Sequence, residues 1–145
     1  MTLLEQALEF RKIFKQEIAK NISRFGFIKK KLWDMQVKLI QEESAEFIEA
    51  ADECFADPEN FEKRLDLTKE LSDLVFVCYQ FAAAFGIDLD LAMNLVYESN
   101  LSKLDEQGEP IFRSDGKVLK GPNYQKPDLS NCIPQSYFYY DTHGK

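Results

Sequence analysis

Two helical stretches that carry acids inside their apolar faces constrain this chain more than any other feature. Residues 39–51 read LIQEESAEFIEAA, and residues 67–81 read LTKELSDLVFVCYQF. At roughly 100° per residue, Glu43 and Glu46 fall inside the apolar stripe of the first stretch. Glu70 and Asp73 lie on the edge of the stripe in the second. An amphipathic helix normally keeps its charges on the opposite face, so these acids need a cation or a proton as a partner.

The four acids form two pairs, each with a spacing of three residues. Residues three apart are neighbours on a helix surface, so Glu43 with Glu46 and Glu70 with Asp73 are two adjacent carboxylate pairs. Facing each other on antiparallel helices, the pairs make an all-oxygen cage, which suits hard divalent cations. The sequence therefore predicts a Mg2+ site, with Mn2+ as an alternative ion. The competing interpretation is a set of solvated acids on glutamate-rich helices.

Four helices are predicted, over residues 2–21, 32–55, 61–85 and 88–104. Thr2 and Glu5 fit a capping box at the start of the first helix, and Asp88 is a suitable N-cap for the fourth. Gly86 is a suitable residue to end the third. Trp33, the single tryptophan, lies beside the apolar stripe of the second helix, where it packs against another helix, a second subunit or a nucleobase.

The pattern changes after residue 104. Residues 110–120 read PIFRSDGKVLK, which predicts a short hairpin with Asp115 and Gly116 in the turn. A lone hairpin is only marginally stable, so it should pack on the helices or on another subunit. We therefore expect an all-α fold of four to five helices over residues 1–104. Residues 105–145 should form a hairpin and loop extension on the same domain.

Composition excludes several other classes of protein. A chain of 145 residues predicts one domain, and a net charge of −7 argues against a protein that coats nucleic acid. Three cysteines without a C-x-x-C motif indicate a reducing, cytoplasmic setting, with Cys54 and Cys78 as core thiols. No apolar run is long enough to predict a membrane span. The single histidine, His143, lies beside the end of the sequence, so histidine-based catalysis is not expected.

The acidic motifs also resemble those of a known superfamily. E-E-x-x-E (Glu42, Glu43, Glu46), followed by E-x-x-D (Glu70, Asp73) and an apolar run, is similar to the all-α nucleoside triphosphate pyrophosphohydrolases. These include MazG-type enzymes and the phosphoribosyl-ATP pyrophosphohydrolase of histidine biosynthesis. The resemblance covers residues 30–104. The segments NLSKLD (100–105) and DGKVLKGPNY (115–124) resemble the short, single-domain MazG-like branch.

The resemblance implies a reaction and a role for individual residues. The reaction is Mg2+-dependent hydrolysis of a (deoxy)nucleoside triphosphate to the monophosphate and pyrophosphate. Glu43, Glu46, Glu70 and Asp73 would bind the metal. Glu42 is the first candidate to orient or deprotonate the attacking water, and Glu46 is the second.

Substrate contacts are expected from the C-terminal part of the chain. In the resembled branch, Asn100 and Lys103 would lie near the substrate phosphates, although a lysine at a helix end also complements the helix dipole. Lys120 and Tyr124 could reach phosphate or base, with solvated loop positions as the alternative. Family members are often completed by a second chain, so we expect a homodimer or homotetramer.

Other functions remain open at this point. The same fold acts on phosphoribosyl-ATP, and its chemistry is equivalent. A non-catalytic helical interaction module, with the acids as solvated networks, is a second alternative. A regulatory protein that binds metal without turnover is a third.

Overall fold

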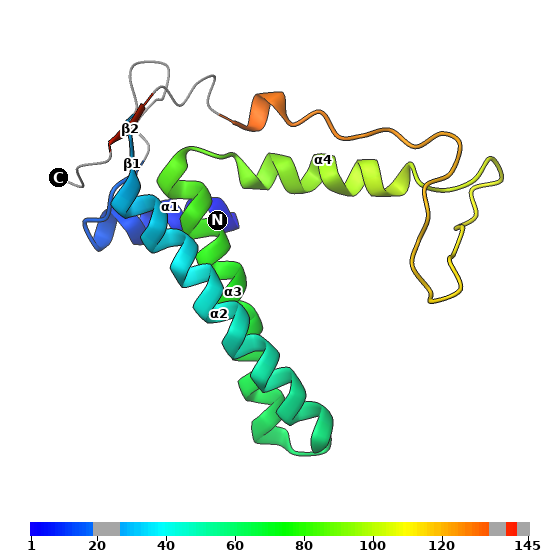
Figure 1. The fold of residues 1–145 in the computed structure, drawn as a ribbon, viewed down its shortest axis with the longest axis horizontal. Coiled ribbons are helices and arrows are strands. Elements are labelled where there is room, and N and C mark those ends of the chain that lie inside the picture. Colours follow the sequence, from blue (N-terminus) through cyan, green and yellow to red (C-terminus); the bar gives the residue numbers. More distant parts are fainter. Residues whose placement is uncertain (19–26, 134–138, 142–145) are drawn as a thin grey trace. The chain divides into compact units, whose positions relative to one another are not determined.

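The computed structural model describes residues 1–18, 27–133 and 139–141. It confirms the all-α class. The elements are α1 (Leu3–Ile13), β1 (Phe27–Lys29), α2 (Lys30–Ala56), α3 (Phe61–Phe85), α4 (Leu89–Leu101), a 3-10 turn at Ser130–Cys132 and β2 (Tyr139–Asp141) (Figure 1). β1 and β2 pair in parallel, with Phe27 opposite Tyr139.

The described residues form two compact units, one of Met1–Ile87 with β2 and one of Asp88–Ile133. Helix α4 is part of the second unit. The predicted division, a helical domain over residues 1–104 with an extension over residues 105–145 packed on it, stays a prediction.

Helix α1 begins as predicted but ends early. Thr2 and Glu5 form the capping box, with Thr2 Oγ1 accepting from the Glu5 amide at 3.2 Å. The helix ends at Ile13 instead of near residue 21. Lys15 takes a left-handed φ of 53°, and the Gln16 amide donates to the Arg11 carbonyl at 2.7 Å. This is a Schellman-type ending with lysine where glycine is usual, so no glycine marks it in the sequence.

Helices α2 and α3 lie side by side in opposite directions (Figure 1). Asp57 and Pro58 lie in the turn between them, as predicted, and Asn60 caps α3 by accepting from the Lys63 amide at 3.2 Å. Gly86 ends α3 with a left-handed φ of 72°, which confirms its predicted role. The short connection and the two caps hold the helices in one register, and this register decides which side chains meet.

An aromatic cluster closes the end of the α2–α3 pair that lies away from this turn. The Trp33 ring lies 4.9 Å from the Phe81 ring and 4.8 Å from the Phe85 ring, between centroids. Of the three partners predicted for Trp33, the structure shows the first: Trp33 packs against another helix, α3. Helix α1 joins α3 through an edge-to-face contact of Phe10 with Phe76 at 5.1 Å.

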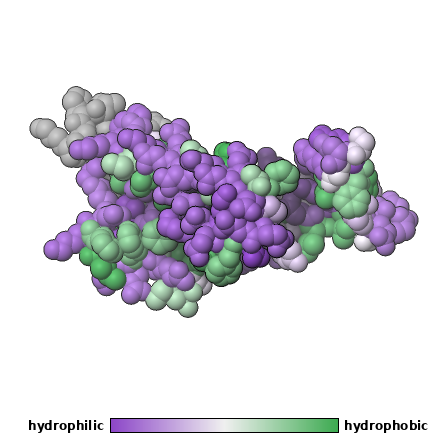
Figure 2. Space-filling model, turned by 90° about the horizontal axis from the view of Figure 1, so that it is seen from below, coloured by the Kyte–Doolittle hydropathy of each residue, from purple (hydrophilic) through white to green (hydrophobic). Residues whose placement is uncertain are grey.

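Several large apolar side chains remain at the surface. Phe55 is 89% exposed and Phe61 is 62% exposed. Figure 2 shows such apolar patches among hydrophilic residues on one face of the molecule. Among the described residues, no single helix is long and apolar enough to cross a membrane, although α3 and α4 taken together reach that length and composition.

The second unit begins with α4, which Asp88 caps as predicted by accepting from the Leu91 amide at 3.0 Å. The prediction of a two-stranded hairpin at residues 110–120 is wrong. The structure has one antiparallel bridge, Phe112 opposite Val118, around a turn in which Gly116 has a φ of 88°. Phe112 is 60% exposed and Val118 43% exposed. Without a packed face, the turn does not extend into strands.

The loop after this turn is tied back to the end of α4. The Gly121 amide donates to the Lys103 carbonyl at 2.9 Å, and Ser99 Oγ donates to the Gln125 carbonyl at 2.7 Å. A Cβ atom on Gly121 would lie 2.5 Å from the Leu104 carbonyl oxygen and 2.6 Å from that of Lys103. Only glycine fits this close approach of two backbone segments.

We expect Gly121→Ala to destabilise the second unit by about 1–3 kcal/mol, because the backbone must move to admit the methyl group. Urea unfolding and the rate of limited proteolysis within residues 105–133 would measure the effect. Asn123→Ala, at an exposed position of the same loop, is the matched control. Equal stability of the two variants would contradict the close approach.

Candidate metal centre

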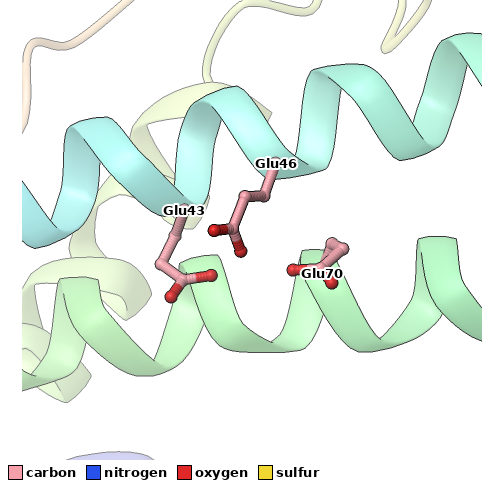
Figure 3. Close-up of side chains that lie close together, drawn as sticks. All are labelled: Glu43, Glu46 and Glu70. Atoms are coloured by element: carbon pink, nitrogen blue, oxygen red, sulfur yellow. The ribbon is translucent and has the colours of Figure 1, made fainter.

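Three carboxylates from two helices converge in the α2–α3 interface. Glu43 and Glu46 project from α2 and Glu70 projects from α3, and each offers an oxygen within 4.8 Å of the others. Figure 3 shows the three side chains pointing toward one another between the helices. The antiparallel register brings them together, since Glu43 and Glu46 lie one turn apart and Glu70 lies across the interface. The predicted proximity of the two acidic motifs is therefore present.

The negative charge of this cluster is only partly neutralised, and some of its oxygens lack hydrogen bonds. Glu43 Oε2 and Glu70 Oε2 are buried and have no hydrogen-bond partner. Partial burial raises the pKa of Glu43, and the neighbouring charges of Glu46, Asp73 and Glu70 raise it further. A buried carboxylate oxygen without a donor is costly. Both features indicate a place where a cation would stabilise the protein.

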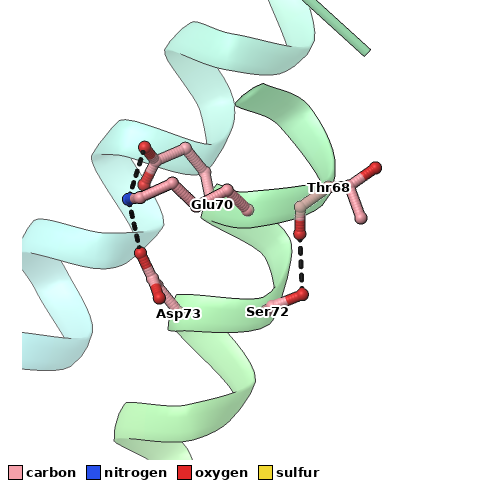
Figure 4. A network of polar contacts seen from close by, with 5 residues as sticks. Thr68, Glu70, Ser72 and Asp73 are labelled. Carbon is pink, nitrogen blue, oxygen red and sulfur yellow. Dashed lines mark hydrogen bonds and ion pairs between the residues drawn. The ribbon is translucent and has the colours of Figure 1, made fainter. Parts of the chain in front are cut away.

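A lysine partly neutralises the α3 side of the cluster. Lys69 Nζ lies 2.7 Å from Asp73 Oδ2 and 3.2 Å from Glu70 Oε1. Hydrogen bonds to Asp73 and Glu70 raise the pKa of Lys69. Figure 4 shows Glu70 and Asp73 joined through this one nitrogen. Asp73 thus lies beside the cluster, held by Lys69, and it contributes to the electrostatic field at Glu43.

The hydroxyl groups on this turn of α3 bond to their own helix. Ser72 Oγ donates to the Thr68 carbonyl at 2.7 Å (Figure 4), and Thr68 Oγ1 donates to the Arg64 carbonyl at 2.8 Å. These hydroxyls are bonded within their own helix. The group of potential metal ligands found among the described residues consists of carboxylates.

Glu42 lies outside the cluster. Its side chain is exposed, and its carboxylate is 3.8 Å from Lys38 Nζ on the solvent side of α2. Glu46 is exposed as well, but it is a member of the cluster. Of the two predicted candidates for activating water, the structure thus places only Glu46 among the converging acids.

The predicted substrate-binding residues all belong to the second unit. Asn100 is exposed near the end of α4, and Lys103 follows that helix as a half-buried residue. Lys120 Nζ lies over the Tyr124 ring, 4.6 Å from its centroid. The bond between Gly121 and Lys103 ties residues 120–124 to the end of α4. Their predicted role in binding substrate stays a prediction.

Three structural features escaped the interpretation of the sequence. Lys69 could have been found from its position four residues before Asp73 and next to Glu70, a spacing that favours ion pairs. Gln36 lies on α2 seven residues before Glu43, and its side chain is buried. The buried contact between Arg11 and Gln80 joins residues 69 positions apart, and no local pattern signals it.

The donor set is chemically suited to a hard divalent cation. Oxygen ligands from carboxylates on facing helices match the preference of Mg2+ and Mn2+, and the two buried oxygens without donors are free to serve as ligands. The residues that could hold such an ion are Glu43, Glu46 and Glu70, with Asp73 available if Lys69 releases it.

An all-α fold with carboxylates converging across an antiparallel helix pair defines the class of protein. The sequence model of the phosphoribosyl-ATP pyrophosphohydrolase family matches residues 7–100, and the chain belongs to this family. The match confirms the resemblance to the all-α nucleoside triphosphate pyrophosphohydrolases. It indicates a hydrolase acting on phosphoanhydride bonds. No curated protein matches the chain at a significant level.

Proposed function

We propose that this protein hydrolyses a (deoxy)nucleoside triphosphate to the monophosphate and pyrophosphate in a reaction that depends on Mg2+, with Mn2+ as an alternative. The observation that carries the proposal is the convergence of Glu43, Glu46 and Glu70, two of them with buried oxygens that lack a partner. Such a cluster, in a chain of a pyrophosphohydrolase family, supports a site for a cation-bound triphosphate.

The proposed step is attack by water on the α-phosphorus. A new bond forms between the water oxygen and this phosphorus, and the bond from phosphorus to the α,β-bridging oxygen breaks. The bridging oxygen leaves with pyrophosphate, and the water proton passes to a carboxylate acting as general base. Membership of the cluster supports Glu46 in this role over Glu42, which pairs with Lys38 at the surface.

The same group of acids would hold the cation. Glu43, Glu70 and Asp73 would act as its ligands together with Glu46. When bound, a divalent cation supplies positive charge to the phosphoryl oxygens and to the leaving pyrophosphate. Lys69 hydrogen-bonds to both Glu70 and Asp73 and partly offsets their repulsion, so Asp73 would become a ligand once Lys69 releases it.

Asn100, Lys103, Lys120 and Tyr124 are proposed to contact the substrate. The two lysines supply positive charge in a chain whose net charge is −7. The hydrogen bond between Gly121 and Lys103 ties the loop that carries Lys120 to the end of α4. Charge-assisted bonds from lysine are suited to phosphate.

The second candidate substrate is phosphoribosyl-ATP. The matching family takes its name from the hydrolysis of this compound. The same bond between the α and β phosphates would be cleaved. The carboxylate cluster serves both substrates equally, since it would act on the triphosphate part that they share.

The assembly and setting are proposed as well. A homodimer or homotetramer is supported by exposed apolar side chains such as Phe55 and Phe61. A reducing, cytoplasmic setting is supported by three unpaired cysteines, Cys54, Cys78 and Cys132. The partner that we propose is a nucleotide, with neither nucleic acid nor membrane as a target.

The decisive experiment is pyrophosphate release from a panel of ribo- and deoxynucleoside triphosphates and phosphoribosyl-ATP, with Mg2+ and with chelator. We expect Mg2+-dependent release of monophosphate and pyrophosphate from at least one of the triphosphates. Turnover of phosphoribosyl-ATP alone would select the second candidate. Absence of turnover on every substrate, with no rise in melting temperature on adding Mg2+, would overturn the enzymatic proposal in favour of a non-catalytic helical module.

A further inference from the structure

Helices α2 and α3 carry a second set of buried polar atoms without partners. In the part of the chain that the structure describes, four such side-chain atoms are found: Gln36 Oε1, Glu43 Oε2, Glu70 Oε2 and Gln80 Nε2. All four belong to α2 or α3. The two carboxylate oxygens are explained by a cation site. The amide oxygen of Gln36 and the amide nitrogen of Gln80 have no such explanation.

The helix register places the two glutamines at the same level. Gln36 lies seven residues before Glu43, and Gln80 lies seven residues after Asp73. Seven residues span about 10.5 Å along a helix. Because α2 and α3 are antiparallel (Figure 1), both displacements run in the same direction. Along the helix pair, the carboxylate cluster lies on one side of the two glutamines. The contact of Trp33 with Phe81 lies on the other side.

A buried arginine fixes the orientation of the Gln80 amide. Arg11 is 1% exposed, and its Nη1 donates to Gln80 Oε1 at 3.3 Å while its Nε donates to the Glu17 carbonyl at 2.7 Å. A guanidinium group only donates hydrogen bonds, so the oxygen of Gln80 must face Arg11. Its Nε2 is therefore left as a donor. Gln80 is 4% exposed and Gln36 is 5% exposed, so bulk water does not satisfy the two atoms.

We propose that Gln36 and Gln80 form a recognition subsite for the hydrogen-bonding edge of a nucleobase, in which Gln80 Nε2 donates to a base acceptor and Gln36 Oε1 accepts from a base N–H. This inference rests on the proposed function, because the base enters only with a triphosphate bound at the carboxylates. A spacing of about 10.5 Å between the two levels is on the scale of the span from phosphate to base within one nucleotide. Every nucleobase with an exocyclic amino or ring N–H group beside an acceptor offers the complementary pair.

The alternative is a purely structural role, in which the amides bond each other or a buried water in the working protein. The two interpretations differ in what they predict for a substrate that has no base. A base-reading pair acts only on ligands that carry a base, whereas a structural pair acts on all ligands equally.

The test uses two variants in the full chain. Gln36→Met keeps the shape of the side chain and removes the acceptor. Gln80→Glu replaces the donor with an oxygen while keeping a partner for Arg11, which protects the fold. Binding of α,β-imido nucleoside triphosphates with the four common bases is measured by calorimetry in Mg2+, beside α,β-imido 2-deoxyribose 5-triphosphate, which lacks a base.

We expect each variant to weaken binding of the best base-bearing ligand about tenfold, the effect of one lost hydrogen bond, and to change the order of preference among bases. Binding of the base-free ligand should stay within about twofold. An unchanged order of preference in both variants would overturn the inference, and so would an equal loss for base-bearing and base-free ligands. If the unmodified protein bound no triphosphate at all, the proposed function itself would fail, which separates the two failures.

Discussion

The Glu43→Gln variant is expected to lose about 10³-fold or more in kcat/KM while keeping its helix content. Glu43 lies in the carboxylate cluster with one buried oxygen that has no hydrogen-bond partner, and its loss removes a cation ligand. Cation-dependent charge stabilisation in phosphoryl transfer is worth several kcal/mol, and each factor of ten in rate corresponds to about 1.4 kcal/mol. Pyrophosphate release, with circular dichroism as the check on folding, measures the effect.

The same variant separates a metal ligand from a structural acid. Burial and neighbouring acids raise the pKa of Glu43, so its charge disfavours the metal-free fold. We therefore expect the metal-free variant to melt no lower than the original protein, and we expect it to lose the rise in melting temperature caused by Mg2+. Glu53→Gln, an exposed acid on the same helix, should change neither quantity. Full turnover by Glu43→Gln would refute the assignment of Glu43 as a cation ligand.

The second large effect is expected for Phe85→Ala, which should lower the free energy of unfolding by about 3–5 kcal/mol. Phe85 is 3% exposed. Its ring centroid lies 4.8 Å from that of Trp33 and 4.8 Å from that of Phe81. Truncation leaves a cavity where α2 and α3 meet, and the surrounding rings cannot fill it completely.

Urea unfolding followed by far-ultraviolet circular dichroism measures this loss. Phe55→Ala is the matched control, since Phe55 is a phenylalanine on α2 that is 89% exposed, and exposed substitutions change stability by about 0.5 kcal/mol or less. A cost for Phe85→Ala as small as that of the control would show that this cluster does not stabilise the helix pair. A large cost for Phe55→Ala instead would indicate that the exposed ring is buried against a second copy of the chain.

The carboxylate cluster and the pair of Gln36 and Gln80 depend on the same helix register. Lys69 neutralises part of the charge from the α3 side, and Arg11 orients Gln80 from α1. Charged and hydrogen-bonding groups thus follow one another along the same two helices. If both proposals hold, the phosphate end of a nucleotide would meet carboxylates and a cation, and its base would meet amides further along the same two helices.

Much of this arrangement follows from local patterns in the sequence. The acids at three-residue spacing, inside one apolar stripe and on the edge of another, predicted two helices whose acidic motifs lie close together. The helices and the meeting of Glu43, Glu46 and Glu70 agree with that prediction. The caps at Thr2, Asp88 and Gly86 follow from side-chain chemistry that acts within a few residues. Short-range signals of this kind are readable because the interacting groups are neighbours in the chain.

Other features needed the tertiary structure, for a physical reason. The early end of α1 rests on a lysine in a left-handed conformation. The hairpin does not extend because its apolar side chains stay largely exposed, Phe112 at 60% and Val118 at 43%. The buried contact of Arg11 with Gln80 and the unpaired amide of Gln36 arise from helix packing between residues distant in sequence. The sequence by itself determined where helices form and where acids gather on them. Only tertiary packing decided which polar atoms are buried without partners, because burial depends on neighbours that no local pattern specifies.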